Sequence, residues 1–272
     1  MQKISDEIKT MKIIQNQKFF KQNLAQLINE LAGANENSAA NLAEGRLIDF
    51  TDDKSAQKKN GGRLVFKNIE FMNCDIGLDN DLTNPQTISG VNFIGCTFRS
   101  CFFGPCVWKD VLLENTCFND YGILDSVLFC RVKIKGKITS FRINKCGFMT
   151  HKNPELQLKI DAFRQEFYGR AEWALDISEA RLSSFDYDGI PARLFVLDTS
   201  TQFVVRRDKF HSLNQLSEEF KSKFSYVTAY LKDFLEDGRE DIVLTVPTSR
   251  PKKFRKPIVD GLSELRTLGL AE

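Results

Sequence analysis

The sequence is poor in the residues that most often carry out catalysis or bind metals. Its 272 residues include only two histidines, His151 and His211, and neither lies in a recognisable arrangement with a nucleophile and an acid. Two imidazoles leave little material for general-base chemistry or metal ligation. The patterns G-x-x-x-x-G-K-[ST], G-x-G-x-x-G and H-E-x-x-H are also absent. We therefore expect a non-enzymatic protein without a cofactor or a metal.

Long apolar runs are missing as well. No stretch approaches the roughly 20 residues that a membrane helix needs. The opening residues, MQKISDEIKTMKIIQNQKFF, carry scattered charges where a secretory signal would have an apolar core. The cysteines number seven, an odd count that favours a reducing compartment over a disulfide framework. The sequence thus predicts a cytoplasmic protein that does not contact a membrane.

A strong net charge is also lacking, because 38 basic residues nearly balance 36 acidic ones. The charges are nevertheless placed unevenly. Acidic residues prevail between positions 66 and 128: Glu70, Asp75, Asp79, Asp81, Asp110, Glu114, Asp120 and Asp125. Only basic ones occur between positions 131 and 145: Arg131, Lys133, Lys135, Lys137, Arg142 and Lys145. Two ends of opposite charge would steer a charged partner; a solvated surface without a partner is the alternative interpretation.

What the sequence does contain is a period of five residues. An apolar residue returns at every fifth position: Ile88, Phe93, Phe98, Phe103, Trp108, Leu113, Phe118, Ile123 and Leu128. A smaller residue precedes most of these by two positions: Val91, Cys96, Cys101, Cys106, Val111, Thr116, Tyr121 and Ser126. Shorter series follow the same spacing: Phe66, Phe71, Ile76; Ile138, Ile143, Phe148; and Ile177, Leu182, Tyr187. Neither the helical period of about 3.6 nor the strand period of two fits, so the pattern predicts a repeat.

The units CTFRS, CFFGP, CVWKD and VLLEN, at residues 96–115, resemble the pentapeptide-repeat family. The resemblance covers roughly 64–148 and 175–187. It implies a mainly β fold, a right-handed quadrilateral β-helix in which four pentapeptides make one square coil and the apolar and small positions point inward. Layers about 4.8 Å apart would stack into about four to five coils. The 23 phenylalanines are then expected to form a ladder along the axis of this solenoid.

Five of the cysteines, at positions 74, 96, 101, 106 and 146, fall on the small inward position. A spacing of five would put successive thiols on different sides of a coil, whereas a zinc site needs ligands that converge on one ion. A free cysteine packs as a small buried hydrophobe. We therefore interpret these residues as core, with metal binding and redox sensing as alternatives.

The flanking segments predict three regions: an N-terminal helix and linker (1–60), a β-helix with insertions (61–188) and a small α+β unit (189–272). The N-terminal helix, at 13–31, has an apolar face and is expected to cap the first coil. A short helix near 158–168 interrupts the repeat. In the last region we predict a hairpin around Thr199–Thr201, a helix at 212–236, a strand at 241–247 and a final helix at 256–272. No family is recognised in this last region.

One basic stretch, SRPKKFRKP, is the candidate contact for an anionic partner. It consists of Arg250, Lys252, Lys253, Phe254, Arg255 and Lys256. Such cations contact phosphates in a salt-sensitive way, and an aromatic ring among them could stack on a base. A solvated loop stiffened by proline is the alternative. Nucleic acid is thus a candidate partner through 250–256 or through 131–145.

The favoured hypothesis is a non-catalytic interaction or scaffold protein of the pentapeptide-repeat type, bacterial, with a protein partner; the oligomeric state is left open. The resemblance also brings a rival, a DNA mimic that regulates a topoisomerase or another nucleic-acid enzyme. The sequence departs from such mimics by its short repeat region, its lack of net negative charge and its large tail. A role in a defence or toxin pathway rests on family analogy alone. An enzymatic hypothesis would need a cleft beside the long helix of the tail.

Overall fold

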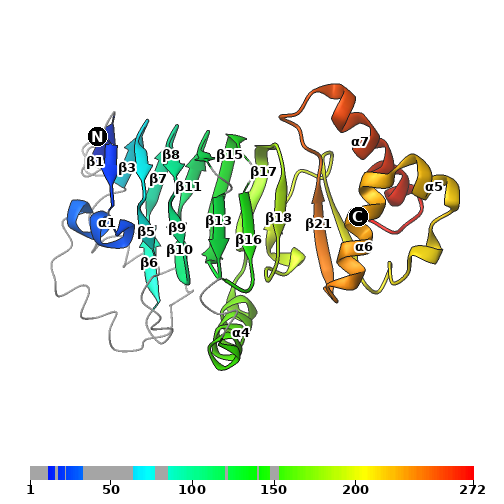
Figure 1. The fold of residues 1–272 in the computed structure, drawn as a ribbon, viewed down its shortest axis with the longest axis horizontal. Helices are drawn as coiled ribbons and strands as arrows, with labels where there is room; N and C mark the ends of the chain where they lie inside the picture. Colours follow the sequence, from blue (N-terminus) through cyan, green and yellow to red (C-terminus); the bar gives the residue numbers. More distant parts are fainter. Residues whose placement is uncertain are drawn as a thin grey trace, which may run out of the picture.

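The computed structural model describes residues 12–15, 18–21, 23–32, 64–76, 85–119, 122–139, 141–147 and 153–272. This part of the chain is built mainly of strands in parallel sheets, with few helices (Figure 1). The strands lie side by side along the long axis of the molecule, and most of the helices gather at the C-terminal end.

Four of the sheets are parallel. The first contains β1 (Lys12–Gln15), β3 (Leu64–Lys67), β7 (Val91–Ile94), β11 (Leu112–Glu114), β15 (Val132–Ile138), β17 (Leu175–Leu182) and β19 (Phe195–Val196). The second contains β2 (Lys18–Phe20), β4 (Glu70–Met72), β8 (Thr97–Arg99) and β12 (Cys117–Asn119). The third contains β5 (Asp75–Ile76), β9 (Phe102–Phe103), β13 (Gly122–Asp125), β16 (Phe141–Asn144) and β18 (Phe185–Tyr187). The fourth contains β6 (Gln86–Ser89), β10 (Cys106–Lys109) and β14 (Leu128–Cys130).

Successive strands of the chain belong to the four sheets in a repeating order. Strands β7, β8, β9 and β10 belong to the first, second, third and fourth sheet in turn, and β11 returns to the first sheet beside β7. We call one such set of successive strands a layer. Each layer therefore pairs its backbone with the layers before and after it, as the parallel registers of β3 with β7 and of β7 with β11 illustrate.

The corners between strands recur at every fifth residue. Positive φ angles occur at Gly90, Gly95, Ser100, Asp110 and Asn115. The missing member of this series is position 105, where a proline fixes φ at a negative value. Gly95 has a further reason to be glycine, because a Cβ there would lie 2.5 Å from Oδ1 of Asn68 in the preceding layer.

Aromatic rings on paired strands stack on one another. One column on the second sheet joins Phe19, Phe71, Phe98 and Phe118, with successive ring centroids 5.6, 4.9 and 5.3 Å apart. Such pairs contribute about 0.5–1.5 kcal/mol each beyond the burial of their area. The expectation that phenylalanine serves packing is confirmed for the three members of this column that are 4% exposed or less, Phe71, Phe98 and Phe118.

The five-residue phase shifts by one residue after Phe118. Leu124, not Ile123, pairs with Phe103, and Phe129 lies opposite Trp108. Leu124 is 1% exposed whereas Ile123 is 42% exposed. The prediction that Ile123 points inward is therefore wrong, because neighbouring residues of a strand face opposite sides and the spacing from Phe118 to Leu124 is one residue longer than the repeat.

The predicted helix at 13–31 is wrong in its first half. Strands β1 and β2 extend the first and second sheets, with Ile14 in register with Phe66 and Phe19 with Phe71. Only α1 (Leu24–Ala32) is helical. Ile14, Phe19 and Leu24 continue the five-residue period. Helix α1 packs on β3, β5 and β6 near the N-terminal end of the sheets (Figure 1), as expected of a cap.

Helix α4 (Pro154–Arg170) interrupts the strands between β16 and β17, where a shorter helix was predicted. Asn153 begins it, since its side chain accepts a hydrogen bond from the backbone N–H of Leu156. The Tyr168 hydroxyl accepts a hydrogen bond from the N–H of Phe129. Because β14 is the last strand of the fourth sheet, this bond satisfies a buried donor at the sheet edge.

The predicted hairpin around Thr199–Thr201 is wrong. Residues 195–196 form β19 of the first parallel sheet, and β20 (Gln202–Arg206) pairs in antiparallel fashion with β21 (Asp241–Thr245). Each apolar run pairs with a strand beside which its side chains are buried. The two runs do not pair with each other, although they are close in the sequence. The predicted helix at 212–236 is divided into η2 (Leu213–Gln215), α5 (Glu218–Lys223) and α6 (Ser225–Glu236). The remaining elements are η1 (Ala192–Leu194) and α7 (Lys252–Thr267).

The sheet of β20 and β21 lies between the parallel sheets and helices α5 to α7 (Figure 1). Polar bonds hold it to the last layer. Gln202 is 2% exposed, and its Nε2 donates to the carbonyl of Ile177 at 2.8 Å. The N–H of Val243 donates to the hydroxyl of Tyr187 at 2.7 Å. The C-terminal region is therefore attached to the sheets through buried hydrogen bonds as well as apolar contacts.

Candidate anion-binding surface

The acidic residues between positions 66 and 128 are largely paired. Glu70 lies between Lys18 and Arg99, 2.7 and 3.2 Å from their nitrogens, and these bonds lower its pKa. Asp110 contacts Arg131 at 2.7 Å. Asp125 is 7% exposed and accepts a bond from Asn144. Residues 79, 81 and 120 of the predicted acidic surface lie outside the described residues. The described acids thus do not form a free negative surface.

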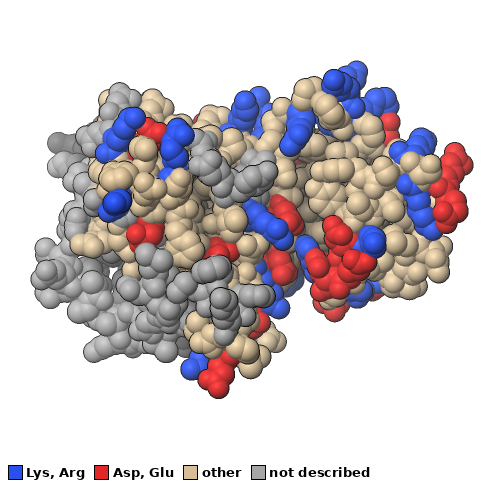
Figure 2. Space-filling model, viewed as in Figure 1, with Lys and Arg blue, Asp and Glu red and all other residues tan. Residues whose placement is uncertain are grey.

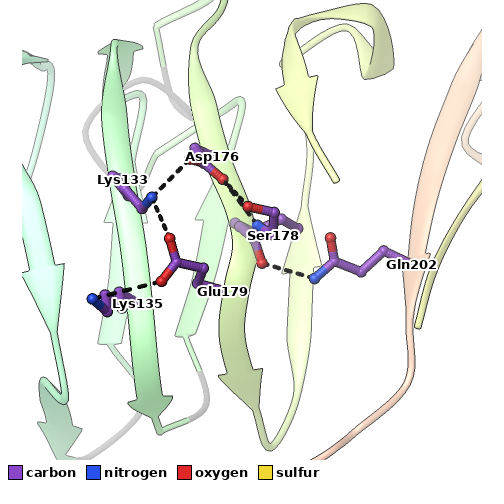
Figure 3. A network of polar contacts seen from close by, with 7 residues as sticks. Lys133, Lys135, Asp176, Ser178, Glu179 and Gln202 are labelled. Atoms are coloured by element: carbon purple, nitrogen blue, oxygen red, sulfur yellow. Dashed lines mark hydrogen bonds and ion pairs between the residues drawn. The ribbon is translucent and has the colours of Figure 1, made fainter. Parts of the chain in front are cut away.

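Five of the six basic residues between positions 131 and 145, all except Lys137, form ion pairs with other described residues. Figure 3 shows Lys133 between Asp176 and Glu179, at 3.5 and 2.5 Å, and Lys135 beside Glu179 at 3.6 Å. The hydrogen bond with Glu179 raises the pKa of Lys133. Arg142 and Lys145 contact acids at 3.2 and 3.9 Å. These ion pairs argue against 131–145 as a nucleic-acid contact.

The basic stretch of the C-terminal region is different. It was predicted as a contact or as a loop, and the loop interpretation is wrong, because α7 begins at Lys252. Arg250 and Arg255 donate to the carbonyls of Ser183 and Thr248, both at 3.3 Å, so both guanidinium groups keep their net charge. Phe254 is 56% exposed, with the ammonium of Lys253 5.0 Å from its ring centre.

Few of the lysines in this stretch are paired with an acidic side chain. Lys256 contacts Asp260 at 2.5 Å. Within the described part of the chain, Lys252 and Lys253 have no ion pair, and both are exposed. Figure 2 shows Lys and Arg side chains gathered over the start of α7, at the upper right of the view.

A groove of about 530 Å³ runs between α7 and the end of α5. Its lining residues are Lys223, Phe224, Lys252, Lys253, Lys256, Pro257 and Asp260. Four lysines and one acidic residue thus line the groove. Gly261 lets the two helices approach, because a Cβ there would lie 2.9 Å from the ring of Phe224. We call this feature the lysine groove.

The position of these lysines on the helix is electrostatically unfavourable. The N-terminus of a helix carries a partial positive charge, which favours acidic side chains there by about 0.3–1 kcal/mol each. The first turn of α7 contains no acidic residue and begins with two lysines. A departure from local preference of this kind is expected where a sequence serves binding. An anion in the lysine groove would offset the repulsion.

A second cavity, of about 30 Å³, lies where the parallel sheets meet the C-terminal helices. Phe185, Tyr187, Tyr226 and Tyr230 contribute to its wall. The hydroxyls of Tyr226 and Tyr230 are 3.0 Å apart, and burial raises the pKa of Tyr230. At roughly 10–15 Å³ for each water molecule, the cavity holds about two. This is the cleft that an enzymatic hypothesis would need, and it is smaller than a typical substrate pocket of about 300–1,000 Å³.

The cysteines follow the predicted inward position with one exception. Cys74, Cys96 and Cys106 are buried, Cys101 is partly buried, and Cys146 is exposed, which contradicts its predicted place in the core. The thiol of Cys96 donates to the carbonyl of Phe66 in the preceding layer at 3.4 Å. Burial raises the pKa of Cys96 to about 11. The described residues contain no group of three or more His, Cys, Asp or Glu side chains placed to hold a metal.

Sequence reasoning found one wall of the lysine groove and missed the other. The composition of 250–256 marked the α7 side, whereas Lys223 and Phe224 reach the groove only through the packing of α5 against α7. Among the two histidines, His211 is exposed and His151 lies outside the described residues. Most of the predicted linker before residue 61 also lies outside them.

Comparisons with models of known protein families, with curated proteins and with solved structures found no significant match. Among the described residues, no helix combines the length and the apolar character that crossing a membrane requires. The resemblance to pentapeptide-repeat proteins therefore rests on the residues of the chain itself.

Proposed function

We propose that this chain is a non-catalytic interaction protein of the pentapeptide-repeat type, whose four parallel sheets form a right-handed quadrilateral β-helix. The observation that carries the proposal is the return of a left-handed corner at positions 90, 95, 100, 110 and 115. A turn at every fifth residue divides the chain into short strands that follow one another from sheet to sheet. The in-register pairs Phe66 with Phe93 and Phe71 with Phe98 support the same arrangement.

Binding is assigned to the sides of the stack because both ends are occupied. Helix α1 packs near the first layer, and the sheet of β20 and β21 adjoins the last one. The side faces keep outward residues in rows about 4.8 Å apart. Rows of this kind make a rigid, nearly flat surface, which suits a protein partner better than a small molecule.

DNA mimicry is the less supported alternative. A mimic of duplex DNA needs rows of unpaired negative charge, whereas Glu70 and Asp110 are engaged by cations of neighbouring layers. The defence and toxin hypotheses have no particular residue in their favour. We therefore put forward the scaffold alone.

The test is capture of partners from native lysate by the full chain and by face variants. Leu112 lies beside the buried Leu113 on the first sheet, and Ile123 is exposed on the third. We expect Leu112→Asp or Ile123→Asp to lose a protein that the wild type retains at both low and high salt. Leu158→Asp, on the exposed side of α4, is the matched control.

Far-UV circular dichroism and thermal melts show first that each variant is folded. Retention of the same proteins by the wild type and both face variants would contradict the proposal. So would a turnover of any substrate that is abolished by substitutions at Tyr226 or Tyr230, which line the small cavity.

A further inference from the structure

We infer that the lysine groove binds the phosphate backbone of single-stranded nucleic acid, with Phe254 stacking on a base beside it. The inference rests on the proposed function, since it names one partner of an interaction protein. It concerns a surface separate from the side faces of the stack, so the two are tested by different variants.

The first step is that the groove selects an anion. Most cations of the basic cluster at 131–145 are paired, as Lys133, Lys135 and Arg142 are with Glu179 and Asp186. Four lysines line the lysine groove; Lys256 is paired with Asp260 at 2.5 Å, and Lys223 lies 4.0 Å from Glu264. Within the described part of the chain, Lys252 and Lys253 have no ion pair. The groove is therefore a concentration of positive charge that the fold itself does not neutralise.

The second step is that phosphate fits better than carboxylate. The planar fork of arginine binds carboxylate and phosphate alike in two-bonded pairs, whereas lysine binds phosphate as a point charge. Both guanidinium groups of the stretch are engaged with backbone carbonyls, those of Ser183 and Thr248. What the groove offers is lysine, whose compact charge binds phosphate without requiring a fixed fork geometry.

The third step is that a single strand fits better than a duplex. The groove is a hollow of about 530 Å³ between two helices, too small to admit the body of a duplex. A sugar-phosphate backbone can enter it. Phe254 stands on the first turn of α7 beside Lys253, 56% exposed, where an unpaired base could stack on its ring. In a duplex the base faces are covered by their neighbours.

Fluorescence anisotropy with a labelled oligothymidylate of about 20 nucleotides tests the inference on the full chain. For single strands the logarithm of affinity falls with the logarithm of salt by about 0.7 for each phosphate contact. Four lysines give an expected slope of about −3 between roughly 50 and 200 mM salt. Lys252→Gln, Lys253→Gln and Lys256→Gln together should leave a slope of about −0.7.

The matched control removes the same charge elsewhere. Lys137, Lys159 and Lys232 are exposed and lie on β15, α4 and α6. Their replacement by glutamine should leave affinity and slope unchanged. Glutamine has nearly the helix propensity of lysine, so the groove variant should not unfold. A thermal melt checks that the control variant is folded. Phe254→Ala should weaken binding at every salt concentration without changing the slope.

Three results would overturn the inference: equal binding by the groove and control variants, a duplex bound as tightly as the single strand, or displacement of the oligonucleotide by a polyglutamate peptide at equal charge. The last result would identify an acidic protein segment as the occupant. Failure here leaves the scaffold proposal standing if Leu112→Asp or Ile123→Asp still loses its protein partner. Failure of the scaffold proposal likewise leaves oligonucleotide binding measurable.

Discussion

The hydroxyl of Tyr168 on α4 accepts a hydrogen bond from the backbone N–H of Phe129 on β14, 3.2 Å away. Both residues are buried. Burial makes this bond consequential, since an N–H hidden from water without an acceptor costs about 1–3 kcal/mol. The inserted helix thus completes the edge of the fourth sheet.

Replacement of Tyr168 by phenylalanine should therefore lower the free energy of unfolding by about 1–3 kcal/mol, because the ring is kept and only the acceptor is lost. Urea unfolding measures this difference. Tyr226→Phe removes a hydroxyl from a side chain that is 53% exposed and should change stability by less than about 0.5 kcal/mol. Equal effects of the two substitutions would argue that the Tyr168 bond contributes nothing.

Gly95→Ala should destabilise the protein more than Gly90→Ala. Both glycines have positive φ, 62° and 66°, so both variants suffer the same backbone strain of about 1–2 kcal/mol. Only at Gly95 does the new Cβ meet an atom, Oδ1 of Asn68 at 2.5 Å, whereas nothing lies within 4 Å at Gly90. Paired thermal melts give the difference. A Gly90 variant as unstable as the Gly95 variant would contradict the close approach of the two layers.

Lys252→Glu should stabilise the free protein. The substitution replaces a cation by an anion at the positive end of α7, a gain of about 1 kcal/mol at low salt that shrinks as salt screens it. Lys232→Glu is the control, because Lys232 contacts Glu236 on α6 at 3.5 Å and its reversal creates repulsion. Melting temperatures at two salt concentrations decide the matter. A lower stability of the Lys252 variant at low salt would show that the macrodipole is not the governing interaction there.

Asp241→Asn should stabilise the protein at neutral pH. Burial raises the pKa of Asp241, although its carboxylate accepts a bond from the N–H of Ala192. A pKa that is higher in the folded state means that this group stabilises the fold below its unfolded pKa and loses that contribution as pH rises through the folded value. The gain from asparagine should therefore be largest near pH 7 and vanish at acid pH.

Asp198→Asn should change stability in the opposite direction at neutral pH. Hydrogen bonds from Ser200, and then Thr201, lower the pKa of Asp198, so its contribution is present at neutral pH and is lost as pH falls. Its variant should be less stable than the wild type near pH 7, with the deficit shrinking in acid. Melting temperatures measured across pH compare the two variants. Parallel pH profiles would contradict the assignment of either carboxyl.

Thiol labelling should separate Cys146 from the cysteines of the interior. Cys146 is exposed, whereas burial raises the pKa of Cys106 to about 12 and leaves its thiol protonated and covered. In the folded chain at neutral pH, an aromatic disulfide reagent should react fastest at Cys146, and Cys146→Ser should remove that phase. Mass spectrometry of the labelled chain identifies the site. Rapid labelling of Cys96 or Cys106 would show that the layers open.

The sequence predicted the strands best where the repeat itself fixes the side chain, as for Phe93 and Phe98. The sequence-based prediction failed where the five-residue repeat and the helical period fit the same residues. The spacing of Ile14, Phe19 and Leu24 fits the repeat, but their neighbours also complete a helical face, and only pairing with β3 and β4 decides between them. The exposed Ile123 was missed because a single inserted residue leaves the apolar pattern nearly intact.

The sequence predicted only the α7 side of the candidate site. Charge density along the chain located 250–256, but it marked 131–145 equally well. The two stretches differ in their ion pairs. Acids from a later strand, Asp176 and Glu179, pair with a lysine of 131–145, whereas they do not pair with 250–256. Ion pairs of this kind join residues far apart in sequence, so composition cannot reveal them.

Helix α4 gives the molecule a direction around its long axis. It stands out from the strands below β13 and β16 in Figure 1 and is bonded to the edge of the fourth sheet. A partner that binds the strand faces therefore has to approach the stack from a side that α4 does not occupy. The inserted helix thus limits the directions from which a partner can reach the strands.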